Sequence, residues 1–207
     1  ITKPFEIREV LARIQVQLRH IEAETKSEAE AEIELEMKVI DFVGFSGSGK
    51  TTLVEQLVTI FCNAGFGVAA IKSAHHDMQV DKPGKDSYRF QAAGAQQVIV
   101  KNDSGWAMMK RTPLKPATLK ELVSKLDPCD LVLVEGFKKE DDADLRLEVW
   151  RPGVKEEPAI YTQDKGIQAV LTDADSIAGC EIPVINLNNP RLIARFIADK
   201  LNLKSRF

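Results

Sequence analysis

The stretch VIDFVGFSGSGKTT, residues 39–52, decides the fold of this chain. A short apolar run, residues 39–43, is followed by a glycine-rich turn and then by a helical pattern that begins at Thr51. Residues 44–51 match the phosphate-binding pattern G-x-x-x-x-G-K-[ST], and the flanking elements are of the kind that this pattern requires. The stretch therefore predicts a strand, a phosphate-binding loop (P-loop) and a helix in direct succession.

Each residue type in this loop has a physical reason. Glycines let the backbone approach phosphates without a Cβ in the way, and the loop N–H groups, with the start of the helix, point at the β-phosphate. Lys50 is expected to place a positive charge between the β- and γ-phosphates, and the Thr51 hydroxyl to bind Mg²⁺. The predicted nucleotide-binding residues of the loop are Gly44, Ser46, Gly47, Ser48, Gly49, Lys50, Thr51 and Thr52.

A second stretch, DLVLVEG at residues 130–136, is an apolar strand that ends in an acidic residue and a glycine. In a P-loop fold, a strand of this kind lies beside the loop strand, and its terminal carboxylate can reach the Mg²⁺ shell directly or through water. Glu135 is therefore the predicted metal-binding carboxylate and, with Lys50, a predicted catalytic residue. Asp130, at the start of the strand, is better suited to a cap or a turn. The alternative is an ordinary buried strand whose last glutamate faces solvent.

A polar segment, residues 75–87, follows the second predicted strand and opens with two adjacent histidines. Ligands of open α/β sheets bind at this edge, so Asp77 is expected near the metal and Lys85 near the phosphates. A transition-metal site is an open alternative, although adjacent side chains diverge and no cysteine is near. A plain solvated loop is another, and Asp86 also serves as an ordinary helix N-terminus.

Base recognition is predicted at residues 172–175, which read TDAD after a late apolar strand. A carboxylate here, Asp173, could accept hydrogen bonds from the N1–H and the exocyclic amine of guanine, which adenine cannot satisfy. The Asn-Lys-x-Asp guanine motif is absent from the sequence, so a turn role for Asp173 stays open.

The bulk composition excludes several classes of protein. With 207 residues and 44% hydrophobic residues, the chain can bury a real core. A net charge of −3 gives no basic footprint for nucleic acid, and no apolar run reaches the roughly 18 residues needed to span a membrane. Three scattered cysteines indicate reduced thiols, so we expect a cytoplasmic protein.

Three zones follow one another along the chain. Residues 1–22 carry apolar residues at steps of three or four, the pattern of an amphipathic helix. Residues 23–36 are acidic and alanine-rich, which indicates a linker or a helical extension. Residues 37–207 alternate strands and helices, including a predicted hairpin of two strands over 97–101 and 106–110, a helix over 118–126 and a strand over 145–151. This alternation predicts an α/β fold with three layers and a mostly parallel sheet.

Taken together, these motifs resemble the molybdopterin-guanine dinucleotide biosynthesis protein B (MobB) family. The matching stretches are residues 44–52 (GFSGSGKTT), 71–88 (IKSAHHDMQVDKPGKDSY), 93–95 (AGA), 106–109 (WAMM) and 131–138 (LVLVEGFK). The loop alone is generic, whereas the second and last stretches in register are highly specific.

The resemblance implies a GTP-binding homodimer with weak GTPase activity. It also implies an adapter role beside the guanylyltransferase that attaches GMP to molybdopterin in the maturation of the molybdenum cofactor. From the motifs alone, an ATP-dependent small-molecule kinase is the alternative, with residues 75–87 lining its acceptor pocket. Residues 1–20 resemble the last strand–helix junction of a response-regulator receiver domain, without its phosphoacceptor aspartate. A fusion relic, a dimerisation arm and a loosely docked tail are all open interpretations of this segment.

Overall fold

The computed structural model of this protein describes residues 37–74, 82–112, 115–137, 142–155 and 158–203. The predicted N-terminal helix and acidic linker lie outside these residues, so the predicted domain boundaries stay predictions. Residues 37–207 group into one compact unit. None of the described helices is long and apolar enough to cross a membrane.

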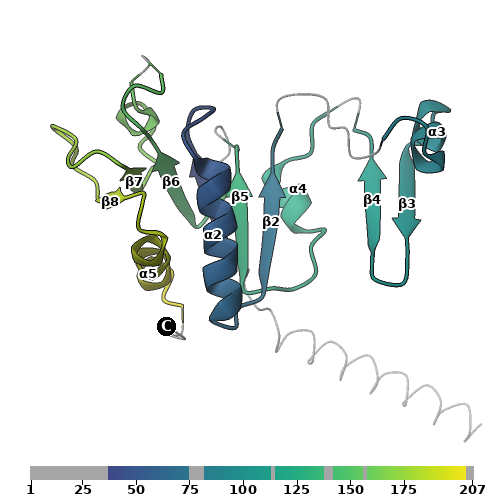
Figure 1. The fold of residues 1–207 in the computed structure, drawn as a ribbon, viewed down its shortest axis with the longest axis horizontal. Coiled ribbons are helices and arrows are strands. Elements are labelled where there is room, and N and C mark those ends of the chain that lie inside the picture. Colours follow the sequence, from purple (N-terminus) through teal and green to yellow (C-terminus); the bar gives the residue numbers. More distant parts are fainter. Residues whose placement is uncertain (1–36, 75–81, 113–114, 138–141, 156–157, 204–207) are drawn as a thin grey trace, which may run out of the picture. The chain divides into compact units, whose positions relative to one another are not determined.

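The main sheet is a row of parallel strands, shown in Figure 1. Its six strands lie in the order β2-β5-β1-β6-β7-β8, and each neighbouring pair is parallel. Their bounds are β1 Lys38–Val43, β2 Val68–Lys72, β5 Leu131–Glu135, β6 Leu145–Val149, β7 Ala169–Thr172 and β8 Val184–Asn186. The predicted parallel α/β sheet is thereby confirmed.

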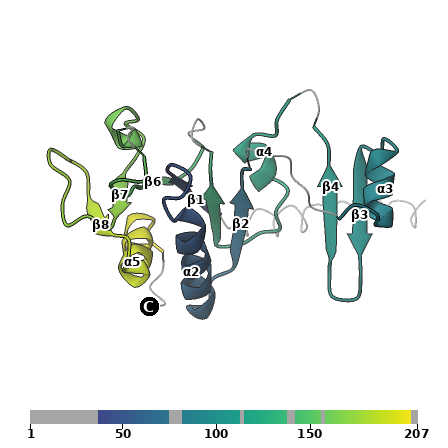
Figure 2. The same ribbon diagram turned by 45° about the horizontal axis from the view of Figure 1, so that its top comes forward.

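The two remaining strands, β3 (Gln97–Lys101) and β4 (Trp106–Lys110), form a separate antiparallel hairpin. Their bounds are those predicted from the sequence. The hairpin turn is closed by Asn102, whose side-chain oxygen accepts from the backbone N–H groups of Ser104 and Gly105 at 2.9 Å each. Helix α3 (Asp86–Ala92) packs against β3, as Figure 2 shows.

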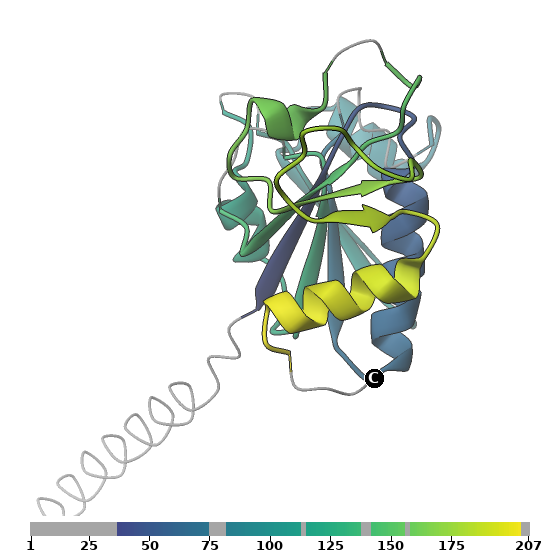
Figure 3. The ribbon, with the colours of Figure 1, turned by 90° about the vertical axis from the view of Figure 1, so that its left-hand side faces the viewer.

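Helices cover both faces of the main sheet, which gives the three predicted layers. On one face, α2 (Lys50–Asn63) and α5 (Pro190–Lys200) pack against each other and against the sheet (Figure 3, blue and yellow). This hydrophobic cluster includes Phe42 and Leu133 of the strands and Leu57 and Ile197 of the helices. Side chains alternate between the faces of a strand, so Val39 and Val132 join Leu119 of α4 (Leu119–Val123) in a second cluster on the other face.

Two elements end two or more residues before their predicted bounds. The helix expected over residues 118–126 is α-helical over 119–123 only, because Thr118 and Glu121 form a capping box that fixes its start and turns follow Val123. The strand expected over residues 145–151 ends at Val149, where a turn at residues 152–154 redirects the chain. This turn matters for the site described next.

Candidate functional site

The candidate site lies where the carboxyl ends of the central strands meet. Phe42 of β1 and Lys72 of β2 are both in register with Glu135, the last residue of β5. After β1 the chain continues to β2 on one side of the sheet, and after β5 it continues to β6 on the other side, so the chain leaves these neighbouring strands in opposite directions. Such a crevice is where open α/β sheets bind their ligands.

The loop from β1 to α2 turns on glycines that cannot be replaced freely. Gly49, immediately before α2, has φ +98°, in the left-handed region that favours glycine. A Cβ on Gly44 would run into the carbonyl oxygen of Val149 on the neighbouring strand. The loop is therefore held close against the end of β6, with α2 beginning at its motif lysine.

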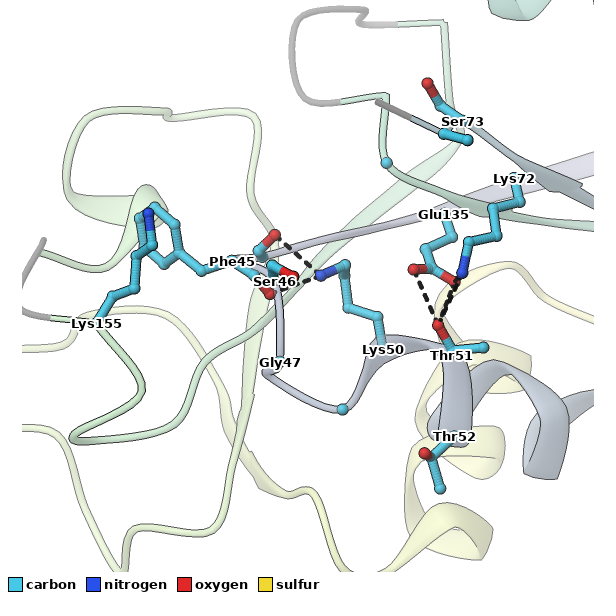
Figure 4. A pocket seen from close by; sticks show the side chains of 14 residues that line it. Phe45, Ser46, Gly47, Lys50, Thr51, Thr52, Lys72, Ser73, Glu135 and Lys155 are labelled. Atoms are coloured by element: carbon cyan, nitrogen blue, oxygen red, sulfur yellow. Dashed lines mark hydrogen bonds and ion pairs between the residues drawn. The ribbon is translucent and has the colours of Figure 1, made fainter. Parts of the chain in front are cut away.

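Lys50 lies inside this loop and is only 9% exposed. Its Nζ donates to the carbonyl oxygens of Gly44 at 3.0 Å and Phe45 at 2.7 Å, as Figure 4 shows. The sequence predicted a positive charge between the β- and γ-phosphates. The structure adds that the ammonium group is enclosed by the loop backbone, where two hydrogen bonds fix its position.

Beside the loop is a cavity of about 680 Å³. The loop contributes Gly44 to Gly47 and Gly49 to Thr52 to its lining, while β2 and β5 end in it with Lys72, Ser73, Ala74, Glu135 and Gly136. Lys155 also lines the cavity. A volume of this size lies in the range of small-molecule and nucleotide sites.

At one wall of the cavity, Thr51 and Glu135 meet across 84 residues of sequence. The Thr51 hydroxyl lies 3.1 Å and 2.9 Å from the two carboxylate oxygens of Glu135. Lys72 joins them, with Nζ 3.0 Å from Thr51 Oγ1 and 3.3 Å from Glu135 Oε2 (Figure 4). A hydroxyl and a carboxylate side by side are the hard oxygen ligands that Mg²⁺ takes when phosphates complete its shell. The donor set therefore fits the predicted metal.

Other predicted site residues lie differently. Ser48 is buried, and its backbone N–H donates to Phe45 O at 3.2 Å, so it does not line the cavity with the rest of the loop. Lys85, at the start of α3, is not among the described lining residues. Asp77 lies outside the described residues. The roles predicted for these three residues stay predictions.

Asp173, the predicted guanine-binding residue, is engaged with a cation. Its Oδ2 lies 3.5 Å from Nη1 of Arg151, which follows β6. The same guanidinium lies 3.6 Å from where a Cβ on Gly49 would be, so it packs against the phosphate loop. Arg151 thus links the loop after β7 to the phosphate loop, a connection that the sequence pattern does not reveal.

The turn after β6 brings a second cation to the loop. Lys155 Nζ lies 5.3 Å from the centroid of the Phe45 ring, a cation–π distance, and it lines the cavity. Sequence reasoning missed Lys72, Arg151 and Lys155. For Lys72 a signal existed, since it ends an apolar strand at the ligand-binding edge. The positions of the other two depend on how β6 is placed next to β1.

Buried polar residues lie along β6 and its neighbours. Asp41 and Arg146 are both buried, with Oδ2 and Nε 3.7 Å apart, and Arg146 Nη1 lies 3.0 Å from Asp164 Oδ2. Glu148 accepts from the backbone N–H groups of Ile160 at 2.7 Å and Tyr161 at 2.8 Å, at the start of the short 3-10 helix η1 (Ile160–Thr162). Burial raises the pKa of Glu148 above its usual value, against the two hydrogen bonds that lower it.

With this geometry in hand, the chain can be compared with known proteins. A family model described as "Molybdopterin guanine dinucleotide synthesis protein B" matches residues 39–173. The chain belongs to this family, MobB. A molybdopterin-guanine dinucleotide biosynthesis adapter protein of Escherichia coli is 37% identical over 164 residues, which cover 78% of this chain and 91% of that protein.

Other similar proteins also carry MobB names. The adapter protein of Haemophilus influenzae is 51% identical over 104 residues, covering 49% of this chain and 58% of that protein. A crystal structure titled molybdopterin-guanine biosynthesis protein B has a TM-score of 0.59 and 25% identity, covering 78% of this chain and 98% of that chain. The Bacillus subtilis MobB structure, at 22% identity, shares the fold with a TM-score of 0.61, covering 79% of this chain and 98% of that one. MobB membership does not favour the small-molecule kinase interpretation.

Proposed function

We propose that this MobB-family chain binds GTP and Mg²⁺ in the cavity beside residues 44–52 and acts as an adapter in molybdenum-cofactor biosynthesis. Its partner would be the guanylyltransferase that attaches GMP to molybdopterin, in the cytoplasm. The observation that carries the nucleotide site is the convergence of the loop, Thr51 and Glu135 on one cavity. The adapter role rests on membership of the family.

In this proposal each residue of the cavity has a binding task. The loop amides and Lys50 neutralise the β- and γ-phosphates from a fixed direction. Thr51 and Glu135 would hold Mg²⁺, and the bound metal would neutralise charge on the transferring phosphoryl group. Arg151 packs on the loop and is paired with Asp173, so we assign it a supporting role. Hydrolysis by such a site is proposed to be slow.

Asp173 remains our candidate for guanine recognition, although its carboxylate already has a partner. The carboxylate is paired with Arg151 at 3.5 Å, and a carboxylate has acceptor sites for more than one donor. It can therefore keep Arg151 and still accept from a guanine edge. Replacement by asparagine would place an amide N–H₂ where an acceptor is needed and would reduce the preference for guanine.

We also propose a homodimer. The hairpin exposes large apolar side chains, with Trp106 67% and Ile99 63% exposed. Apolar groups gathered in this way on a soluble protein mark an interaction surface. A second copy of the chain is the partner that the MobB resemblance implies.

A competition experiment tests the nucleotide proposal. The full chain is loaded with a fluorescent GTP analogue in Mg²⁺ and displaced with unlabelled GTP, ATP or GDP. We expect GTP to displace the analogue at a concentration well below that of ATP. Equal displacement by ATP would contradict guanine recognition, and no binding of the analogue would contradict the nucleotide site itself.

A further inference from the structure

Lys72 occupies a position that the proposed nucleotide chemistry does not use. Its backbone ends β2, in register with Glu135. Its ammonium group lies 3.0 Å from Thr51 Oγ1 and 3.3 Å from Glu135 Oε2, the two oxygens assigned to Mg²⁺. The side chain of Lys72 is 56% exposed, whereas that of Glu135 is 13% exposed. The lysine can therefore swing away into solvent, while the carboxylate stays in place.

The two oxygens suit either cation. Thr51 Oγ1 and Glu135 Oε2 are 2.9 Å apart, and neighbouring ligands of an octahedral Mg²⁺ at about 2.1 Å lie about 2.9 Å from each other. A Mg²⁺ ion bound to this pair would lie within a few ångströms of the present ammonium position, where the two positive charges repel strongly. One cation must leave before the other can bind.

We propose that Lys72 is a built-in competitor of Mg²⁺ at the Thr51–Glu135 pair, an inference that rests on the proposed function of the cavity. The ammonium keeps the hydroxyl and the carboxylate together in the absence of metal. A metal–triphosphate complex displaces it, because the metal supplies the positive charge that the pair needs and the loop binds the attached phosphates. The competition makes metal binding depend on the nucleotide that accompanies it.

The test is the Mg²⁺ requirement of nucleotide binding. Binding of a fluorescent GTP analogue by the full chain is followed as Mg²⁺ is added from a chelated starting point. Lys72→Met, which keeps the length of the side chain and removes its charge, should lower the half-saturating Mg²⁺ concentration by about two- to fivefold, the size of a partly exposed ion pair. Lys125→Met removes an equal charge from an exposed lysine just after α4 and should leave that concentration unchanged.

A double-mutant cycle separates competition from a general charge effect. In a Glu135→Gln background, Lys72→Met should no longer lower the Mg²⁺ requirement, because the contested ligand is gone. An unchanged or higher requirement in the single Lys72 variant would overturn the proposal, as would loss of nucleotide binding under chelation, which would make Lys72 a phosphate ligand. If the unmodified chain binds no nucleotide at any Mg²⁺ concentration, the proposed function itself fails and takes this inference with it.

Discussion

At the scale of single residues, Lys50 shows how an enclosed charge serves a phosphate site. Its ammonium group is held by two carbonyl oxygens of its own loop, at 3.0 Å and 2.7 Å, and is 9% exposed. An ammonium placed in this way before the ligand arrives needs little rearrangement to meet phosphate oxygens, so less free energy is lost in ordering it. The same enclosure makes the choice of substitution important, because alanine would also leave a void.

Lys50→Met is therefore the sharper variant, since methionine fills most of the space without the charge. We expect GTP affinity to fall roughly 10- to 100-fold, corresponding to a lost hydrogen bond to a charged group of about 1.5–3 kcal/mol. Calorimetric titration in Mg²⁺ measures this loss, with Lys125→Met as the matched control. Thermal unfolding of the variant shows whether the fold is retained; an unaltered affinity in a folded variant would remove Lys50 from the site.

At the scale of elements, the side chain of Glu148 connects β6 to η1 by hydrogen bonds. Its carboxylate accepts two backbone N–H groups, and glutamine has one acceptor oxygen, so Glu148→Gln leaves one buried donor without its partner. We expect the free energy of unfolding to fall by about 1–3 kcal/mol, partly offset because a buried charge is no longer desolvated. Urea denaturation near neutral pH measures the difference.

The pH dependence of the same variant has a definite sign. Burial raises the pKa of Glu148 in the folded protein, so between its usual and its raised pKa the folded chain binds more protons than the unfolded chain. Stability contributed by this group is present at low pH and is lost as pH rises through the raised pKa. Glu148→Gln should flatten that part of the profile. A profile parallel to that of the unmodified chain would show that Glu148 does not titrate there.

These elements also show what the sequence could predict. The strand, loop and helix of residues 39–63 follow from local patterns, because glycine, the motif lysine and apolar periodicity act on neighbouring residues. Glu135 could be selected because an apolar strand ends at an acidic residue. The Arg151–Asp173 ion pair and the hydrogen bonds of Glu148 to η1 could not be predicted. Each depends on which strands become neighbours in the sheet, and no single stretch of sequence determines the strand order.

At the scale of the whole molecule, the nucleotide site and the core that supports it belong to one part of the chain. Both hydrophobic clusters and every described residue of the cavity lie within residues 37–203. The first described strand starts at Lys38 and is buried between two other strands. The described strands and the described lining of the cavity therefore all come from residues 37–203.

A chain shortened to residues 37–207 should accordingly bind GTP with an affinity within about twofold of the full chain, because every described residue of the cavity is retained. Light scattering on both proteins adds the oligomeric state. If the homodimer forms through the apolar hairpin, the shortened chain stays dimeric. If it becomes monomeric with unchanged GTP affinity, residues 1–36 act as the dimerisation arm, and the exposed Trp106 and Ile99 must serve another partner. A large loss of GTP affinity would instead place part of the site in the first 36 residues.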